Sequence, residues 1–169
     1  DIRIVDGSNS PVAVLKRGEM WIKGPNIMKG YWNRPDATAS AIDELGWFHS
    51  GDVGYLDEEG YLYICDRLKD MVISGGENVY PAEVESVLFE HPAVAEVAVI
   101  GLPDDKWGEA VTAVAALVPG ADLSLEELRS FAETKLARYK LPLRLHVVDA
   151  LPRNPAGKVL KFQLRESLA

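Results

Sequence analysis

The chain has 169 residues and a formal net charge of −8, with 18 lysines and arginines against 26 aspartates and glutamates. Its 47% hydrophobic content is that of a globular protein, not a disordered one. The acidic balance argues against nucleic acid as a partner, because nucleic-acid binding needs a basic face. No apolar run approaches the roughly 18 residues of a membrane span. The single cysteine, Cys65, rules out an internal disulfide and favours a reducing, cytoplasmic location.

The first part of the chain, up to about Asp66, is expected to be rich in β-strands. Short strands separated by Gly, Pro and Asp turns are expected at 1–6, 19–23, 47–56 and 61–64. Residues 36–45 predict a short helix capped by Asp36. The chain opens directly on a strand, and a few short strands alone form only a marginal core. This part is therefore expected to be the end of a larger domain.

The second part, from about Lys69, is expected to mix strands and helices. Strands are expected at 71–74, 94–101, 109–118 and 143–148, and helices at 82–89, from 124 to about 136 and from about 160. Pro81 suits the first turn of a helix, and Ser124 begins a pattern that resembles a capping box. The predicted fold class is α+β: a β-rich remnant of one domain, followed by a small domain with a central sheet flanked by helices.

Three short motifs have ordinary structural explanations when each is taken alone. The loop 153–158, Arg-Asn-Pro-Ala-Gly-Lys, predicts a tight turn with a solvated lysine. The pair Gly75-Gly76 indicates either a turn or a place where backbone approaches a ligand closely. Residues 49–52, His-Ser-Gly-Asp, do not form a hydrolytic triad, because triad members are not adjacent and no Gly-x-Ser-x-Gly elbow occurs. The three histidines lack the spacing of a zinc site.

The combination of motifs is far more specific than its parts. The runs 21–32, 46–52, 66–78 and 152–158 stand in the order and spacing of the AMP-forming acyl-CoA synthetases, and the resemblance covers essentially the whole chain. That superfamily also contains luciferases and the adenylation domains of peptide synthetases. The run 75–85, Gly-Gly-Glu-Asn-Val-Tyr-Pro-Ala-Glu-Val-Glu, is most similar to fatty-acyl and aryl-acyl CoA ligases.

The resemblance implies roles for four residues in adenylation and domain motion. Asp52 matches the aspartate that accepts hydrogen bonds from the ribose hydroxyls of ATP, and Arg67 matches an arginine on the ribose or phosphate side. Lys158 matches the lysine that enters the active site for adenylation only, where a flexible ammonium offsets the repulsion between carboxylate and triphosphate. Lys69 matches the hinge about which the C-terminal domain rotates between the two half-reactions.

The resemblance also implies a coenzyme A site and a division into domains. The residues expected to line the pantetheine tunnel are Gly75, Gly76 and Glu77, and those expected to contact the CoA nucleotide are Trp107, Arg138, Tyr139 and Lys140. Residues 1–66 are expected to belong to the last subdomain of the large adenylation domain. Residues 67–69 are expected to form the hinge, and 70–169 the mobile C-terminal domain.

The activity implied by the resemblance is a two-step acid–thiol ligation. A carboxylic acid, expected to be a medium- or long-chain fatty acid, reacts with ATP to give acyl-AMP and pyrophosphate, and the CoA thiol then displaces AMP. The family's phosphate loop and its magnesium-binding glutamate do not occur in this sequence. We therefore expect the chain to be a C-terminal fragment that cannot form acyl-AMP alone, with Mg²⁺ held by the missing N-terminal part.

Three other functions stay open at this point. The sequence is also compatible with a stand-alone module that binds CoA or a protein without catalysis. It also agrees with a related adenylating enzyme, such as an aryl-acid ligase or a luciferase-like protein. A purely structural domain without a ligand is the least favoured, because four motifs occur in order. The full-length enzyme is compatible with peripheral membrane contact, and nothing in the sequence indicates an oligomeric state.

Overall fold

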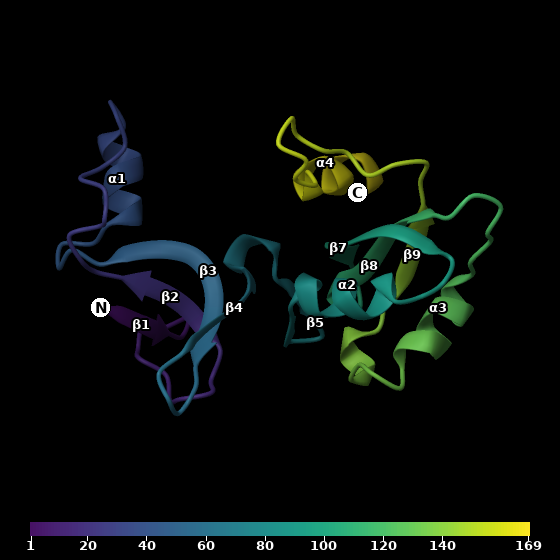
Figure 1. Cartoon of the computed structure of the whole chain (residues 1–169), viewed down its shortest axis with the longest axis horizontal. Coiled ribbons are helices and arrows are strands. Elements are labelled where there is room, and N and C mark those ends of the chain that lie inside the picture. Colours follow the sequence, from purple (N-terminus) through teal and green to yellow (C-terminus); the bar gives the residue numbers. More distant parts are fainter. The chain divides into compact units, whose positions relative to one another are not determined.

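The structure is a computed structural model that describes all 169 residues, and the chain forms two compact units, Asp1–Lys69 and Asp70–Ala169. Figure 1 shows the first unit in purple to blue, and the second from teal to yellow. Each unit has its own sheet, so the fold is α+β with the strands in two separate groups. None of the helices is both long enough and apolar enough to cross a membrane.

The first unit is built on a four-stranded antiparallel sheet. Its strands pair in chain order: β1 (Ile2–Val5), β2 (Gly18–Ile22), β3 (Phe48–Leu56) and β4 (Leu62–Arg67). Val5, Trp21 and Trp47 form the buried cluster of this unit, and Ile4, Met20 and Val53 are buried beside the sheet strands that carry them. Two indole rings supply most of the cluster's apolar volume, which is typical of a small sheet without a covering layer of helices.

The helix expected at 36–45 is shorter than predicted and is not capped by Asp36. Helix α1 covers Pro35–Ala41, and its N-cap residue, Arg34, makes no side-chain capping bond. Asp36 lies inside the first turn, where a carboxylate favours the positive end of the helix dipole. The helix ends early because the Asp43 carboxylate accepts hydrogen bonds from two backbone N–H groups, at residues 45 and 47, and so forms a competing turn.

The second unit contains a five-stranded sheet. Strands β7 (Val94–Asp104) and β8 (Gly108–Leu117) form a long antiparallel hairpin, and the other edge of β8 pairs with β5 (Val72–Ser74) and, in parallel, with β9 (Arg144–Val147). Strand β6 (Glu77–Val79), which was not predicted, pairs with β5 through a two-residue turn. That turn is Gly75-Gly76, with φ angles of +60° and +84°, as the tight turns of twisted hairpins require.

Helices cover both faces of this sheet. Helices α2 (Pro81–Phe89) and α3 (Leu125–Ala132) pack on one face, and α4 (Lys161–Leu168) packs on the other (Figure 1). Alternate residues of β7 point to opposite faces, so Val99 contributes to the α2 and α3 side while Ile100 contributes to the α4 side. Burying each such aliphatic side chain stabilises the unit by about 1.5–3 kcal/mol. The central sheet flanked by helices confirms the predicted fold class.

The capping box at Ser124 is present as predicted. Ser124 Oγ accepts a hydrogen bond from the Glu127 N–H at 3.2 Å, and Glu127 Oε2 accepts one from the Ser124 N–H at 2.9 Å. The backbone and hydroxyl donors of Ser124 hold the pKa of Glu127 below its ordinary value. Helix α3 ends at Ala132, four residues before the predicted end, although Leu136 beyond it still packs into the core.

Candidate functional site

Asp52 and Arg67, the two residues assigned to the nucleotide, lie opposite each other on β3 and β4. Arg67 Nε lies 3.0 Å from Asp52 Oδ1, and the two side chains are 50% and 24% exposed. The pair is therefore open to solvent, and the carboxylate still has lone pairs that could accept hydroxyl hydrogen bonds. Strand pairing alone brings these two residues together from positions 15 apart in the chain.

A distortion of β3 just before Asp52 is held in place by two neighbouring side chains. Gly51 has a φ of +70°, and the pairing of β2 with β3 shifts register in this region. Ser50 Oγ donates a hydrogen bond to the Met20 carbonyl at 2.6 Å and accepts one from the Asp52 N–H at 3.1 Å. Glu19 Oε1 accepts a hydrogen bond from the Gly51 N–H at 3.1 Å. These contacts fix the direction of the backbone that presents Asp52.

His49 and Ser50 lie next to each other but have separate partners. The His49 ring stacks on Trp21 with ring centroids 3.9 Å apart and planes 6° apart. Its Nε2 lies 3.7 Å from Asp43 Oδ2 and makes no hydrogen bond. The Ser50 hydroxyl donates to the backbone of β2. His49 and Ser50 therefore serve the packing and pairing of the sheet, and they do not form a nucleophile–base pair.

Lys69, assigned as the hinge, is exposed in a single 3₁₀ turn, Leu68–Asp70, and is the last residue of the first unit. The next residue, Asp70, pairs with Arg165 of α4, whose Nη2 lies 3.0 Å from Asp70 Oδ1. This ion pair is partly buried and ties the start of the second unit to its last helix. The beginning of the second unit is thus anchored within that unit, while Lys69 itself is exposed.

Lys158 projects from an exposed loop that precedes α4. An isolated antiparallel bridge between Arg153 and Val159 closes this loop at its base. Lys158 makes no ion pair in the structure, whereas Lys161 three residues later pairs with Glu85. An exposed ammonium without a carboxylate partner is available to an anionic ligand.

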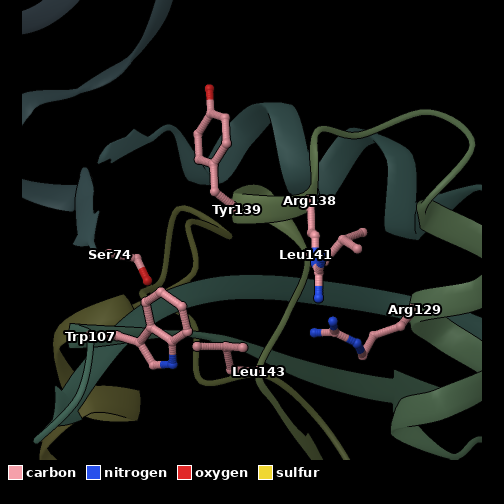
Figure 2. A pocket seen from close by; sticks show the side chains of 7 residues that line it. All are labelled: Ser74, Trp107, Arg129, Arg138, Tyr139, Leu141 and Leu143. Atoms are coloured by element: carbon pink, nitrogen blue, oxygen red, sulfur yellow. The ribbon is translucent and has the colours of Figure 1, made fainter. Parts of the chain in front are cut away.

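The second unit also contains a pocket of about 390 Å³. It is lined by Ser74, Trp107, Arg129, Arg138, Tyr139, Leu141 and Leu143. Figure 2 shows the Trp107 indole beside Leu143, and the guanidinium groups of Arg129 and Arg138 directed into the same space. The Tyr139 ring points away from the two arginines. A flat aromatic wall beside two guanidinium groups suits a ligand with a planar base and phosphate groups.

Three residues that the sequence assigned to the CoA nucleotide meet in this pocket, and one does not. Trp107, Arg138 and Tyr139 line it. Lys140 does not, because its ammonium pairs with Glu83 of α2 and its side chain is only 13% exposed. Its charge is already compensated inside the unit, so Lys140 is a structural cation in this structure.

Arg129 is the pocket residue that sequence reasoning missed. It lies on α3, and its Nη1 donates a hydrogen bond to the Pro142 carbonyl, which holds the guanidinium at the pocket wall. In the sequence it is one arginine in the last turn of an amphipathic helix, where a basic residue is ordinarily explained by the helix dipole. Only the packing of α3 against the segment 141–143 places it near Arg138.

The turn Gly75-Gly76 lies next to the pocket rather than inside it. The Gly75 N–H donates a hydrogen bond to the Trp107 carbonyl at 2.8 Å. A Cβ atom on Gly75 would lie 2.9 Å from Cε3 of the Trp107 ring, whereas one on Gly76 would meet nothing within 4 Å. Glu77 is the first residue of β6, and its side chain is exposed. Glycine at position 75 therefore lets the turn and the indole ring approach closely.

Comparison with known proteins places these features in one family. Residues 83–158 match the AMP-binding enzyme C-terminal domain family. The chain is 53% identical over 162 residues to long-chain-fatty-acid–CoA ligase FadD13 of Mycobacterium tuberculosis, covering 96% of this chain and 32% of that protein. It is 48% identical over 165 residues to feruloyl-CoA synthase of an Amycolatopsis species, covering 98% of this chain and 33% of that protein.

A solved structure gives the same result. The o-succinylbenzoate CoA synthetase MenE of Bacillus subtilis, in complex with its acyl-adenylate intermediate, matches with a TM-score of 0.89 and 46% sequence identity. The match covers 98% of this chain and 33% of that one. The chain thus spans about a third of the length of the curated relatives that it matches.

Proposed function

Because the chain belongs to the AMP-forming acyl-CoA synthetases, we propose that it acts as the C-terminal part of an enzyme that joins a carboxylic acid to coenzyme A through an acyl-AMP intermediate. The observation that carries the proposal is the pocket of the second unit, where an indole and two guanidinium groups face one space. This arrangement fits the nucleotide of CoA, which combines a purine with phosphate groups.

In the first half-reaction, Asp52 and Arg67 hold the ribose side of ATP, and Lys158 supplies positive charge at the reacting carboxylate. The carboxylate of the substrate attacks the α-phosphorus of ATP, and pyrophosphate leaves. An ammonium that bridges the two anions lowers their repulsion as they approach and stabilises the charge that develops. The exposed, unpaired state of Lys158 supports this role.

In the second half-reaction, the CoA thiol attacks the acyl carbonyl and AMP leaves. We assign the CoA nucleotide to Trp107, Arg129, Arg138 and Tyr139, and the pantetheine arm to the Gly75-Gly76 turn and Glu77. Residues 67–69 act as the hinge between 1–66 and 70–169. The exposed position of Lys69 and the anchoring of Asp70 by Arg165 support a pivot at this point.

The acid that the enzyme activates is a separate proposal. The relatives carry names that refer to a long-chain fatty acid, a feruloyl group and o-succinylbenzoate. We favour a medium- or long-chain fatty acid, on the basis of the 53% identity to the fatty-acid ligase. Mg²⁺ accompanies ATP in such enzymes, but no group of three or more His, Cys, Asp or Glu side chains in this chain could hold a metal ion.

The test is a chimera in which residues 1–169 replace the matching segment of FadD13. We expect it to consume ATP and CoA in the presence of a fatty acid, since both half-reactions then have a complete site. Lys158→Ala should cripple acyl-AMP formation and spare thioester formation from supplied acyl-AMP. An equal loss of both half-reactions would contradict the role of Lys158.

A second candidate function is CoA binding without catalysis, because the pocket lies entirely within one unit. Titration of the 169-residue chain with adenosine 3′,5′-bisphosphate, the nucleotide end of CoA, tests the pocket that both candidates share, and the activity of the chimera separates them. Micromolar binding that Arg138→Ala removes and Arg34→Ala spares, together with an inactive chimera, would favour the binding module. Arg34 is a suitable control because it is an exposed arginine of the other unit, paired with Asp36.

A further inference from the structure

The loop that carries Lys158 is closed by its own backbone. The Asn154 N–H donates a hydrogen bond to the Lys158 carbonyl at 2.9 Å, and the Gly157 N–H donates one to the Asn154 carbonyl at 2.9 Å. Gly157 has a φ of +82°, a conformation that L-residues with side chains rarely adopt. The loop is thus a defined turn and not a loose segment.

The Asn154 side chain adds a second set of bonds inside the same turn. Its Oδ1 accepts hydrogen bonds from the Ala156 N–H at 3.0 Å and from the Lys158 N–H at 2.9 Å. The intervening Pro155 has no N–H and a restricted φ, so it neither competes for this oxygen nor lets the turn open freely. One side-chain oxygen therefore sets the backbone of Lys158 directly.

Arg153 fastens the turn to the sheet of the second unit. Its Nη1 donates a hydrogen bond to the Gly157 carbonyl at 2.6 Å, and its Nη2 lies 3.0 Å from Glu96 Oε2. Glu96 belongs to β7, the antiparallel partner of β8. On the other side of the loop, Lys161 pairs with Glu85 at 2.7 Å. Both ends of the loop are thus anchored to elements of the core.

These contacts matter because the lysine side chain itself is flexible. Four rotatable bonds separate its backbone from its ammonium, and ordering them costs conformational entropy. If the backbone were also free, the ammonium would reach the reacting atoms less often, and misplacement by about 1 Å costs about 100-fold in rate. A preformed turn already fixes the backbone of Lys158, so only the side chain remains to be ordered.

We propose that Asn154 is a positioning residue for the adenylation step, which sets the backbone of Lys158, and that Arg153 and Glu96 hold the turn against β7. The proposal rests on the proposed role of Lys158 in acyl-AMP formation. Asn154 acts through Lys158 and touches no substrate. Its loss should therefore affect the half-reaction in which Lys158 takes part and leave the other half-reaction intact.

The experiment compares both half-reactions in the FadD13 chimera. Asn154→Ala should lower kcat for acyl-AMP formation about 10-fold to 100-fold, with an unchanged KM for ATP and unchanged thioester formation from supplied acyl-AMP. Asn154→Asp should restore most of the rate, because a carboxylate oxygen can accept the same two hydrogen bonds. Lys158→Ala serves as the reference for complete loss of the lysine.

A matched control lies in the turn between β3 and β4. There Asp57 Oδ1 accepts hydrogen bonds from the Glu59 N–H at 3.0 Å and the Tyr61 N–H at 2.8 Å, the same spacing as in the Lys158 loop. Asp57→Ala should leave both half-reactions unchanged. Equal loss of both half-reactions in Asn154→Ala would overturn the positioning role and indicate a structural one. If Lys158→Ala itself fails to separate the half-reactions, the proposed function falls, and this inference falls with it.

A second measurement uses the 169-residue chain and needs no activity. Amide hydrogen exchange at Ala156 and Lys158 should be slow in the unchanged chain, because both N–H groups are bonded to Asn154. Asn154→Ala should accelerate exchange at these two positions and leave the amides of α4 unaffected. Fast exchange at Lys158 in the unchanged chain would overturn the inference.

Discussion

The Gly75-Gly76 turn allows a direct test of why glycine stands beside the pocket. Both residues have a positive φ, so alanine at either position should cost about 1–2 kcal/mol for the left-handed backbone. Only Gly75 faces Trp107, and an added Cβ there would lie 2.9 Å from Cε3 and 3.2 Å from Cζ3 of the ring. Gly76→Ala is therefore a matched control that has the backbone strain without the clash.

The free-energy cost of the clash depends on how far the Trp107 ring can move. Overpacking costs about 1–3 kcal/mol, and the low end applies because the Trp107 side chain is 40% exposed and can shift into solvent. Gly75→Ala should thus destabilise the second unit by about 2–3 kcal/mol in total, against about 1–2 kcal/mol for Gly76→Ala. The shifted ring also changes the wall of the pocket.

Urea unfolding, followed through NMR signals of β7 and β8, reports the stability of the unit that contains the turn. Calorimetric titration with adenosine 3′,5′-bisphosphate measures the affinity of the pocket for the nucleotide end of CoA. Gly75→Ala should weaken binding and Gly76→Ala should spare it. In a Trp107→Ala background the two glycine substitutions should cost the same, because the clash is gone. Equal costs for the two substitutions in the unchanged background would refute the reasoning.

Three further predictions concern the stability of the second unit. Leu88→Ala should destabilise it by about 2–5 kcal/mol in urea unfolding, because Leu88 is completely buried between α2 and the sheet; the adjacent Phe89→Ala should cost at most about 0.5 kcal/mol, because Phe89 is 60% exposed. Ser124→Ala should cost about 1 kcal/mol near neutral pH through loss of the capping box. Ser124 lowers the pKa of Glu127, so the charge of Glu127 stabilises the fold fully above its ordinary pKa of 4.5 and ceases to do so as the pH falls through the lowered folded value. A difference between Glu127→Gln and the unchanged chain that stays constant across this acid range would contradict that account.

Local patterns were sufficient for most elements of the second unit. The apolar run 97–102 predicts the centre of β7, Pro81 predicts the start of α2, and the Ser124 capping box predicts the start of α3. Each of these signals involves residues within one turn or one strand of one another. The roles of Lys158 and Asp52 stay predictions, although the structure shows both side chains accessible.

Other features could not be predicted because their causes lie elsewhere in the chain. Strand β6 is only three residues long and depends on pairing with β5 across the glycine turn. Helix α1 was predicted too long because the sequence alone does not show which aspartate accepts backbone hydrogen bonds. In the folded chain the Asp43 carboxylate accepts two of them and forms a turn after the helix. Lys140 was assigned to CoA by resemblance, and nothing in the local sequence reveals that its ammonium pairs with Glu83, 57 residues away.

The sequence by itself determined the family, the α+β class and the order of the motifs, because these depend on residue identity and on short-range periodicity. The tertiary structure decided which charged groups are free. It pairs Lys140 and Lys161 with carboxylates, leaves Lys158 unpaired, and places Arg129 beside Arg138 at the pocket. The physical reason is that the availability of a charge depends on the groups within a few ångströms of it, and folding brings those groups together from distant parts of the chain.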